Sequence, residues 1–463
     1  MEDNELLARA IKKAMSKGGD FADIFIEHKR SSELQLEDNK IEKVVSGHYS
    51  GIGLRLIYKG KTFYAYSNDF SKDSLFDMAY SVTKAAEGAS EDIVINLKKK
   101  TPHITFPIKK FPNEVSFSTK AELVMRGNEI ARNFHQNIRQ VSIFYRDTSQ
   151  KIKILNSEGF LVEDHRVYTT AFVRVIASDN GIIQTGYESV GGHIGFELFE
   201  NNLIEEIALK SAKRAVMMLK ARRAPGGRMP VVISSEAGGT MIHEAIGHGL
   251  EADLVQQKVS VYSDMIGQKV ASSAITVIDD ATIPFKRGSF AFDDEGTPSK
   301  SNILVDKGIL VNYMYDRYTA LIDGVSSTGN GRRESYEHKP LPRMTNTFIA
   351  PGNIAPEDVI KSVTNGLLVK KMGGGQVNTV TGDFVFEVQE GYLIENGKVT
   401  EPVRGATLIG NGPDVLKSID MVASDLGFSI GTCGKDSQGV PVSDAMPTLR
   451  IPEMVVGGEV GRF

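Results

Sequence analysis

A change of pattern at Ala224-Pro225-Gly226-Gly227 limits the possible folds of this chain more than any other feature. Before this point, helical apolar spacings and strand-like runs come in blocks rather than in strict βαβ order. After it, short apolar runs are separated by glycine turns, which is typical of antiparallel β structure. We therefore expect an α+β protein with two domains, residues 1–224 and residues 225–463.

The N-terminal domain is expected to combine helices with an antiparallel sheet. Apolar residues at helical spacing predict helices over residues 4–17, 74–89, 119–137 and 203–221. Residues 98–113 contain prolines and lysines and are predicted to form an extended crossover. Strands are predicted in Phe21–Lys29, around Leu34 and Leu36, in a hairpin of Gly51–Tyr58 and Thr62–Tyr66, and within Gln140–Phe199.

The C-terminal domain is expected to be mostly antiparallel β, barrel-like or sandwich-like, with a metal-binding helix near its start. The apolar run Met229–Ser234 predicts a strand, and Glu236–Gly239 predicts the turn that follows it. The helix is predicted over Thr240–Gln257. Short apolar runs such as Ala274–Asp279 and Phe384–Tyr392 then continue towards the end of the chain.

This predicted helix carries the pattern H-E-x-x-x-H, in which His243 and His248 flank Glu244. Imidazole is a good zinc ligand, and a carboxylate beside the metal can deprotonate a bound water. The familiar helical zinc motif spaces its histidines four apart, whereas a spacing of five puts them roughly 140° apart on a regular α-helix. Two geometries would bring the rings together: a π-bulge, or a helix that ends at Gly247 with His248 in the turn.

The only cysteine, Cys433, is the candidate third ligand, because thiolate binds zinc and the residue lies between glycines in a predicted loop. Lys435 could lower the pKa of its thiol. Glu251 and Asp253 are weaker candidates for a fourth ligand, and could instead support the ligands or face solvent. The ordinary alternative for Cys433 is a small buried apolar side chain.

Composition argues against several classes of function. The 54 Lys and Arg residues against 58 Asp and Glu residues give a net charge of -4, so no basic excess is available for nucleic acid. No apolar segment is long enough for a membrane helix, and the start of the sequence lacks the features of a signal peptide. With a single cysteine, we expect a cytoplasmic protein without membrane or direct nucleic-acid partners.

Several further motifs, taken with the histidine pattern, give the chain a specific resemblance. The sequence resembles the TldD/PmbA family of metallopeptidases, once described as modulators of DNA gyrase. It is most similar to the catalytic TldD-type subunit, because the PmbA-type subunit lacks H-E-x-x-x-H. The matching stretches are His243–Glu251, Asp293–Gly296, Gly329–Tyr336, Pro342–Thr347, Gly391–Gly397 and Gly431–Lys435.

The resemblance implies that His243, His248 and Cys433 bind Zn²⁺ and that Glu244 is the general base on zinc-bound water. It also implies a cytoplasmic protease that hydrolyses small unfolded peptides. The family's active form is a heterodimer with a PmbA-type subunit, and a homodimer is the alternative where that partner is missing. Residues 436–439 depart slightly from the family pattern, which leaves the cysteine assignment intact.

Substrate contacts are predicted at four other residues. Tyr336 and Arg332 are candidate donors to the developing oxyanion, although a core tyrosine and a surface arginine are the ordinary alternatives. Gly374 and Gly375 are candidate cleft walls, since glycine lets another backbone approach closely, and a simple turn is their alternative. An extended peptide is expected to join an exposed strand edge. Endo- and exo-cleavage both remain open.

Two functions compete with a zinc peptidase. The first is a non-catalytic subunit or scaffold of a peptidase complex, which the presence of Glu244 with both histidines and Cys433 argues against. The second is a gyrase-associated regulator, which the charge balance argues against where direct contact with DNA is concerned.

Overall fold

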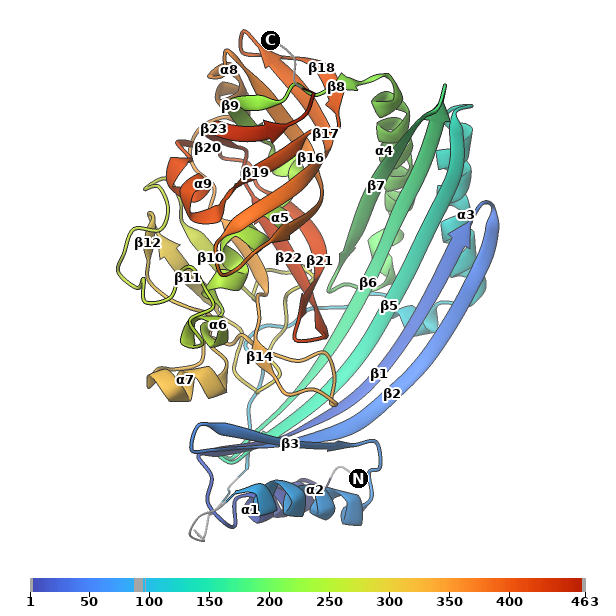
Figure 1. Cartoon of the computed structure of the whole chain (residues 1–463). Coiled ribbons are helices and arrows are strands. Elements are labelled where there is room, and N and C mark those ends of the chain that lie inside the picture. Colours follow the sequence, from blue (N-terminus) through green and yellow to red (C-terminus); the bar gives the residue numbers. More distant parts are fainter. Residues whose placement is uncertain (1–2, 87–94, 96, 460–463) are drawn as a thin grey trace.

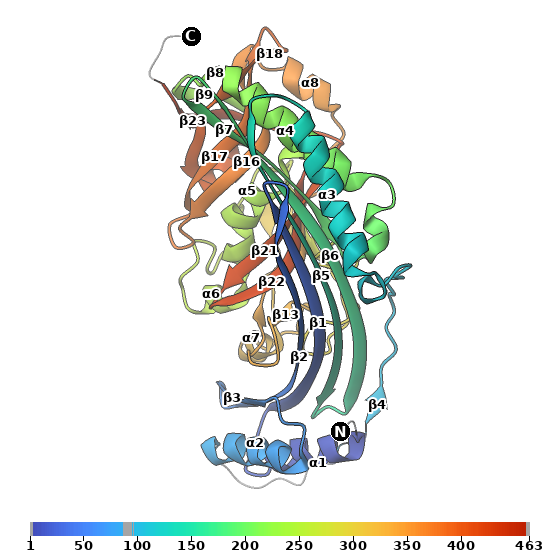
Figure 2. The same cartoon turned by 90° about the vertical axis from the view of Figure 1, so that its right-hand side faces the viewer.

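The computed structural model describes residues 3–86, 95 and 97–459. The first half of the chain forms a long, curved sheet, and the strand-rich second half lies beside it (Figure 1). The view at 90° shows helices on the outer side of the sheet, away from the second half (Figure 2). The predicted α+β class, with a strand-rich C-terminal half, is therefore confirmed.

We call the first of these sheets the N-terminal sheet. Its strands follow the order β3-β2-β1-β5-β6-β4, and β7 also pairs with β6. All neighbours are antiparallel except β4 and β6, which are parallel. The bounds are β1 Phe21–Glu37, β2 Lys40–Tyr58, β3 Lys61–Ser67, β4 Lys98–Lys99, β5 Ile138–Asn156, β6 Phe160–Asp179 and β7 Ile182–Gly192.

Strand β1 is a single strand where the sequence predicts two. It pairs along nearly its whole length with β2 on one side and β5 on the other, so polar residues at its middle do not interrupt it. Its even-numbered apolar residues, such as Ile24 and Leu34, face the helices, whereas Phe25 faces the second half of the chain. One face of the sheet therefore supports helices and the other contacts the C-terminal half.

Four helices cover the helix-bearing face in two pairs, as the apolar spacing predicts. One pair packs near β3 and the other packs across β5, β6 and β7. Residues 87–89, the end of the second predicted helix, lie outside the described residues. The helices are α1 Asn4–Ala14 and α2 Lys72–Ala85, then α3 Phe117–Asn133 and α4 Leu203–Lys220, with 3₁₀ turns η1 Pro112–Glu114 and η2 Phe196–Phe199.

The C-terminal half contains a closed barrel. Strands follow one another in the order β16-β9-β23-β19-β17, and pairing between β16 and β17 closes the ring. Closure leaves no exposed edge around the ring, and its apolar interior belongs to the largest core of the molecule. The strands are β9 Gly227–Ile233, β16 Asn365–Val377, β17 Asp383–Glu395, β19 Thr407–Asn411 and β23 Leu449–Gly457, with β8 Arg222–Arg223, β18 Lys398–Arg404 and β20 Met421–Val422 attached to them.

A six-stranded sheet, which we call the side sheet, lies beside the barrel. Its order is β12-β11-β10-β15-β22-β21, so β21 is an edge strand, and it lies next to β7 of the N-terminal sheet. Only β15 and β22 are parallel. The strands are β10 Val277–Asp280, β11 Ser301–Asp306, β12 Ile309–Leu310, β15 Asn346–Ile349, β21 Gly427–Lys435 and β22 Gln438–Met446.

Short elements complete the second half. They are the strands β13 Gly331–Arg332 and β14 Leu341–Pro342, the helices α7 Arg317–Asp323, α8 Pro356–Lys361 and α9 Gly412–Ser418, and the 3₁₀ turn η3 Ser235–Ala237. No helix in the described part of the chain is long and apolar enough to cross a membrane. The boundary between residues 1–224 and 225–463 stays a prediction; there the chain passes from α4 through β8 into β9.

Candidate metal centre

The two histidines lie on a helical segment that changes its winding. Helix α5 (Thr240–Ile242) continues into a π-helical turn, η4 (His243–Gly247), and then into a 3₁₀ turn, η5 (His248–Leu250). A π-turn contains one extra residue, so it returns residues five apart to nearly the same side of the helix. Of the two geometries that the sequence allows, the structure therefore shows the π-helical one.

The continuous helix predicted over Thr240–Gln257 is wrong beyond Leu250. Glu251 adopts an extended conformation, with φ -75° and ψ 122°, and separates η5 from α6 (Ala252–Gln256). The backbone on both sides of Glu251 pairs with Met314, which accepts from Ala252 N–H at 3.0 Å and donates to the Leu250 carbonyl at 2.8 Å. This pairing with another segment replaces the helical hydrogen bonds.

Glycines allow the segment to pack closely against its neighbours. A Cβ atom at Gly247 would lie 2.2 Å from Sδ of Met344, and one at Gly239 would lie 2.2 Å from the backbone N of Ala445 on β22. Neither approach is possible for a residue with a side chain. The two glycines therefore allow the histidine-bearing segment to lie close to Met344 and to β22 of the side sheet.

Cys433 lies on strand β21, not in the loop that its flanking glycines predict, because the segment pairs with β22, and it completes a cluster with the two histidines. One donor atom from each of the three residues lies within 4.8 Å of the others. The rings of His243 and His248 are nearly perpendicular, at 86°, with their centroids 5.0 Å apart, and Nε2 of His248 lies 3.5 Å from Sγ of Cys433. The three residues that the sequence predicts as ligands are thus brought together.

The thiol of Cys433 is set up to ionise. Burial on its own would raise its pKa, but hydrogen bonds and charge interactions with His243 and His248 outweigh burial and lower the pKa to about 5. Thiolate is therefore the prevailing form at neutral pH, and thiolate is the form that binds metal. The histidines, rather than Lys435, cause this shift.

Glu251 supports His248 from the side away from Cys433. Its Oε2 lies 3.0 Å from Nδ1 of His248, and its side chain is fully buried. Burial would raise the pKa of Glu251, but Lys435 and His248 lower it to about 2, so the carboxylate is charged. The Lys435 ammonium lies 3.1 Å from Glu251 and 2.6 Å from Asp253. A carboxylate behind a histidine fixes the ring orientation and the tautomer that can bind metal.

Asp444 occupies a similar position behind His243, which sequence analysis missed. Its Oδ2 lies 3.8 Å from Nδ1 of His243, a buried nitrogen that has no hydrogen-bond partner in the described residues. The backbone N–H of Gly239 and the hydroxyl of Ser429 donate to the other carboxylate oxygen of Asp444. Its position on β22, next to the strand of Cys433, is visible only once the strand pairing is known.

We expect Glu251→Gln to weaken zinc binding by about 10–100-fold, the usual effect of losing a carboxylate that orients a metal-binding histidine. A glutamine keeps the size of the side chain but removes the charge that orients His248. Titration of the metal-free protein with zinc in a competing chelator measures the change.

Asp253→Asn is the matched control, because Asp253 shares the Lys435 contact but does not contact His248. Its zinc affinity should stay near that of the unmodified protein. Equal losses in both variants would assign the effect to the Lys435 ion pairs instead of to the orientation of His248.

Glu244 follows His243 directly in the π-turn and is partly exposed. Within the described part of the chain, its carboxylate makes no hydrogen bond or ion pair. Glu244 is next to His243 in the chain, and a carboxylate that is not occupied by another group is free to accept a proton. This is the arrangement expected of a general base.

The donor set fits zinc. A tetrahedral zinc ion with typical bond lengths separates a sulfur and a nitrogen ligand by about 3.5 Å, which matches the Cys433–His248 distance of 3.5 Å. Two imidazoles and one thiolate leave a fourth position for a water or substrate atom, as catalytic zinc sites require. Both histidines also have a carboxylate on their Nδ1 side.

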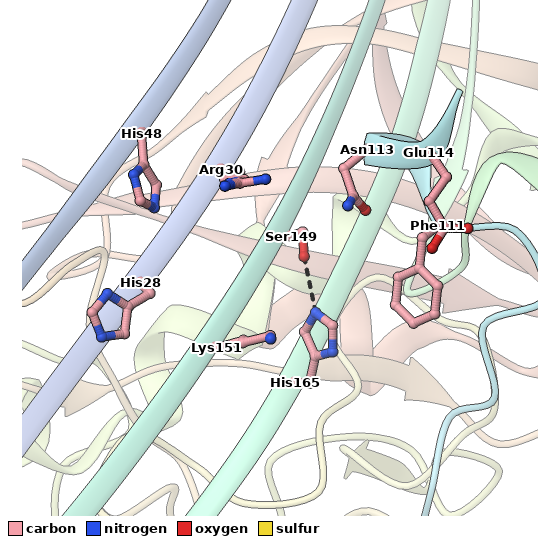
Figure 3. A pocket seen from close by; sticks show the side chains of 9 residues that line it. All are labelled: His28, Arg30, His48, Phe111, Asn113, Glu114, Ser149, Lys151 and His165. Carbon is pink, nitrogen blue, oxygen red and sulfur yellow. Dashed lines mark hydrogen bonds between the residues drawn. The ribbon is translucent and has the colours of Figure 1, made fainter. Parts of the chain in front are cut away.

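A second group of histidines is not arranged as a metal site. His28, His48 and His165 line a pocket on the helix-bearing face of the N-terminal sheet (Figure 3). Among the described residues, only the His243, His248 and Cys433 cluster brings three such donor atoms together. The ring of His165 instead stacks on Phe111 at 5.5 Å and bonds to Ser149.

The two candidate oxyanion donors have structural contacts. Arg332 is buried and donates to the carbonyls of Met344 and Pro441 at 2.6 and 2.7 Å. Tyr336 is also buried, and its ring lies 4.9 Å from that of Tyr49 on the N-terminal sheet. Their predicted part in substrate binding stays a prediction.

Gly374 and Gly375 lie in an exposed part of β16 where the pairing with β17 is irregular. The space where a Cβ of Gly374 would lie is open, whereas a Cβ at Gly375 would meet the ring of Phe386 at 1.9 Å. An open backbone is compatible with a cleft wall, and that assignment also stays a prediction.

Comparison with family models matches nearly the whole chain to one group of enzymes. Residues 226–458 match the PmbA/TldA metallopeptidase C-terminal domain. Residues 110–219 match the central domain of the same group, and residues 22–91 match its domain 1. The matched ranges include the predicted metal ligands and Glu244.

Individual relatives agree with these matches. A metalloprotease TldD homolog from Haemophilus influenzae is 37% identical over 95% of this chain and 93% of its own length. A solved structure from Thermotoga maritima, named for a proposed role as a modulator of a DNA gyrase, shares the fold with a TM-score of 0.79 and 22% identity, covering 94% of this chain and 96% of its own. TldE from Thermococcus kodakarensis aligns with a TM-score of 0.76 and 19% identity, covering 98% of this chain and 99% of its own.

Proposed function

The chain belongs to the PmbA/TldD family of metallopeptidases, and from this premise we propose that it is a zinc peptidase acting on small unfolded peptides. The observation that carries the proposal is the convergence of His243, His248 and Cys433, with Glu244 directly after His243 in the chain. His243 and Cys433 are buried, which supports unfolded peptides as the substrates. An extended peptide can reach a buried metal site that the surface of a folded protein cannot.

His243, His248 and Cys433 would hold the zinc ion, and Glu251 would orient the ring of His248. When bound there, zinc supplies a Lewis acid that lowers the pKa of water towards about 7 and polarises a carbonyl. The Glu244 carboxylate takes the proton of the attacking water and passes it to the leaving amine. Its partial exposure supports this role, because both water and a peptide must reach it.

We also propose a partner and a location. The partner is a PmbA-type subunit, and a homodimer is the alternative; the resemblance to TldD-type relatives supports the first. The location is the cytoplasm, where a reducing environment keeps the Cys433 thiol free. Size-exclusion chromatography of the chain alone and with a co-expressed PmbA-type subunit measures which dimer forms.

We expect a zinc chelator to reduce hydrolysis of an unstructured peptide more than about 100-fold, because the Lewis acid supplies several kcal/mol of transition-state stabilisation. Added zinc should restore turnover. The measurement is peptide hydrolysis followed by mass spectrometry, with zinc content determined in parallel. The same chelator saturated beforehand with zinc is the control. Full activity of zinc-free protein would contradict the proposal.

A further inference from the structure

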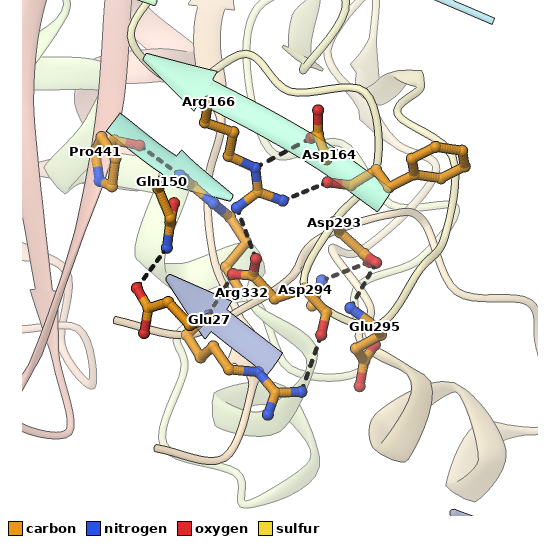
Figure 4. A network of polar contacts seen from close by, with 12 residues as sticks. Glu27, Gln150, Asp164, Arg166, Asp293, Asp294, Glu295, Arg332 and Pro441 are labelled. Carbon is orange, nitrogen blue, oxygen red and sulfur yellow. Dashed lines mark hydrogen bonds and ion pairs between the residues drawn. The ribbon is translucent and has the colours of Figure 1, made fainter. Parts of the chain in front are cut away.

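A polar pocket of about 190 Å³ lies between the N-terminal sheet and the β21–β22 hairpin. Its walls come from β1, β5 and β6 on one side and from the C-terminal half on the other, and Figure 4 shows part of this contact. Cationic side chains outnumber acidic ones in the lining. The cationic residues are Lys29, Arg146, Arg166, Arg287, Arg332 and Arg333, and the acidic residues are Asp294 and Glu334.

Some of these cations are already paired with carboxylates. Arg166 forms ion pairs with Asp164 and Asp294 (Figure 4), at 3.2 Å and 2.7 Å. Lys29 lies 3.6 Å from the buried Glu27, and Arg333 lies 3.6 Å from Asp23. The pairs Arg166–Asp294 and Arg333–Asp23 join the two halves of the chain, and each of the three cations has a carboxylate to balance its charge.

Three arginines are not paired in this way. Arg146, Arg287 and Arg332 have no carboxylate partner within salt-bridge distance in the part of the chain that the structure describes. Arg332 donates only to main-chain carbonyls, and Arg287 donates to the Gly431 carbonyl and to Oγ1 of Thr432. Nε of Arg287 is buried without a partner. We call these three residues the arginine pocket.

The three charges repel one another in a partly dry site. Burial first, and then the nearby charges of Arg332 and Arg146, lower the pKa of Arg287 to about 10. Burial likewise lowers the pKa of Arg332. Arg332 is buried and Arg287 is half-buried, so their positive charges without a counter-ion are costly, and an anion bound among the three guanidinium groups would remove that cost.

We propose that the arginine pocket binds a carboxylate of the peptide substrate, an inference that rests on the proposed peptidase function. Arg287 is held against Gly431 and Thr432, the two residues before Cys433 on β21. Side chains of consecutive strand residues point to opposite faces, so the pocket and the metal centre lie on opposite faces of this edge strand. The proposed peptide reaches both by passing beside β21, whose outer edge pairs with no other strand in the described residues.

The arginine pocket and the metal centre flank consecutive residues of β21, Thr432 and Cys433. A short extended stretch of peptide is therefore expected to separate the bound carboxylate from the scissile bond. Two sources can supply the carboxylate: the C-terminus of a short peptide or the side chain of Asp or Glu. Both have the planar geometry that pairs with guanidinium groups.

Binding to a non-cleaving protein tests the proposal without relying on turnover. Rhodamine-labelled pentapeptides with uncharged side chains are titrated with zinc-loaded Glu244→Gln protein, and the fluorescence anisotropy of the peptide is measured. Two of the peptides differ only at the C-terminus, which is a free acid in one and an amide in the other. We expect the acid to bind on the order of tenfold more tightly, the value of one charge-assisted contact. A third peptide has an amidated C-terminus and carries Glu where the other two carry Gln. If it binds as tightly as the peptide with the C-terminal acid, side-chain carboxylates are a source of the bound group.

Arg146→Gln, introduced into the same background, should reduce the acid-to-amide ratio towards one, and Arg287→Gln should do the same. Arg146 is exposed and makes no side-chain contact that folding requires, so this variant remains informative if Arg287→Gln misfolds. Arg30→Gln is the control, because Arg30 lies on the opposite face of the same sheet (Figure 3) and should leave the ratio unchanged.

The possible results separate this inference from the peptidase proposal. Equal binding of acid and both amides, or a ratio that neither arginine variant changes, would overturn the arginine pocket as a carboxylate site. Hydrolysis of the amidated peptide by the unmodified zinc protein would leave the peptidase proposal standing in that case. Failure of the zinc protein to cleave any peptide would contradict only the peptidase proposal, since the binding ratio is measured independently.

Discussion

Glu244→Gln is expected to reduce peptide turnover by about 10²–10⁴-fold while the protein keeps its zinc. Glutamine has the shape of glutamate but cannot accept the proton of the attacking water. Glu244 is not part of the donor cluster, so the three metal-binding side chains should be unaffected. Single-turnover hydrolysis of an unstructured peptide and zinc content, measured on the same preparation, check both halves of this expectation.

Glu236→Gln provides the comparison, because Glu236 lies in the turn just before the same helical segment and its exposed carboxylate is paired with Lys370. It should retain both turnover and metal. If Glu244→Gln lost its zinc, the side chain would be a ligand; if it kept full turnover, another group would have to accept the proton.

The sequence predicts the helices and the strand-rich second half because apolar periodicity is a local property. Prediction from the sequence fails where contacts with a distant segment determine the local structure. The helix over Thr240–Gln257 ends early because Met314 pairs with the backbone beside Glu251. Strand β1 continues through polar residues because β2 and β5 hydrogen-bond to it on both sides.

The residues of the candidate site likewise fall into those that the sequence alone identifies and those that only the folded structure reveals. The spacing of His243 and His248 already requires a π-turn or a helix end, and a single cysteine narrows the choice of a third ligand. Asp444, Arg146 and Arg287 could not be found in this way, because an isolated aspartate or arginine has no distinctive spacing. Their roles come from strand pairing and from charges that lack partners, which only the folded chain reveals.

Cys433→Ala is expected to abolish both zinc binding and turnover, with a loss of zinc affinity beyond the roughly 100-fold upper range for residues that only orient a ligand. Removing the thiolate leaves two neutral imidazoles, which hold zinc weakly because the site then lacks its only anionic donor in the cluster. Zinc titration and peptide hydrolysis measure the two losses.

Val440→Ala is the control that separates a lost ligand from a damaged core. Val440 is the cross-strand neighbour of Cys433 on β22, and the two side chains are equally buried, at 1% and 3% exposure. Removing two methyl groups there should lower the free energy of unfolding by roughly 2 kcal/mol. If Val440→Ala is destabilised in this way yet keeps zinc and turnover, the losses in Cys433→Ala follow from the missing sulfur. If both variants lose zinc, packing of the β21–β22 hairpin is what maintains the site.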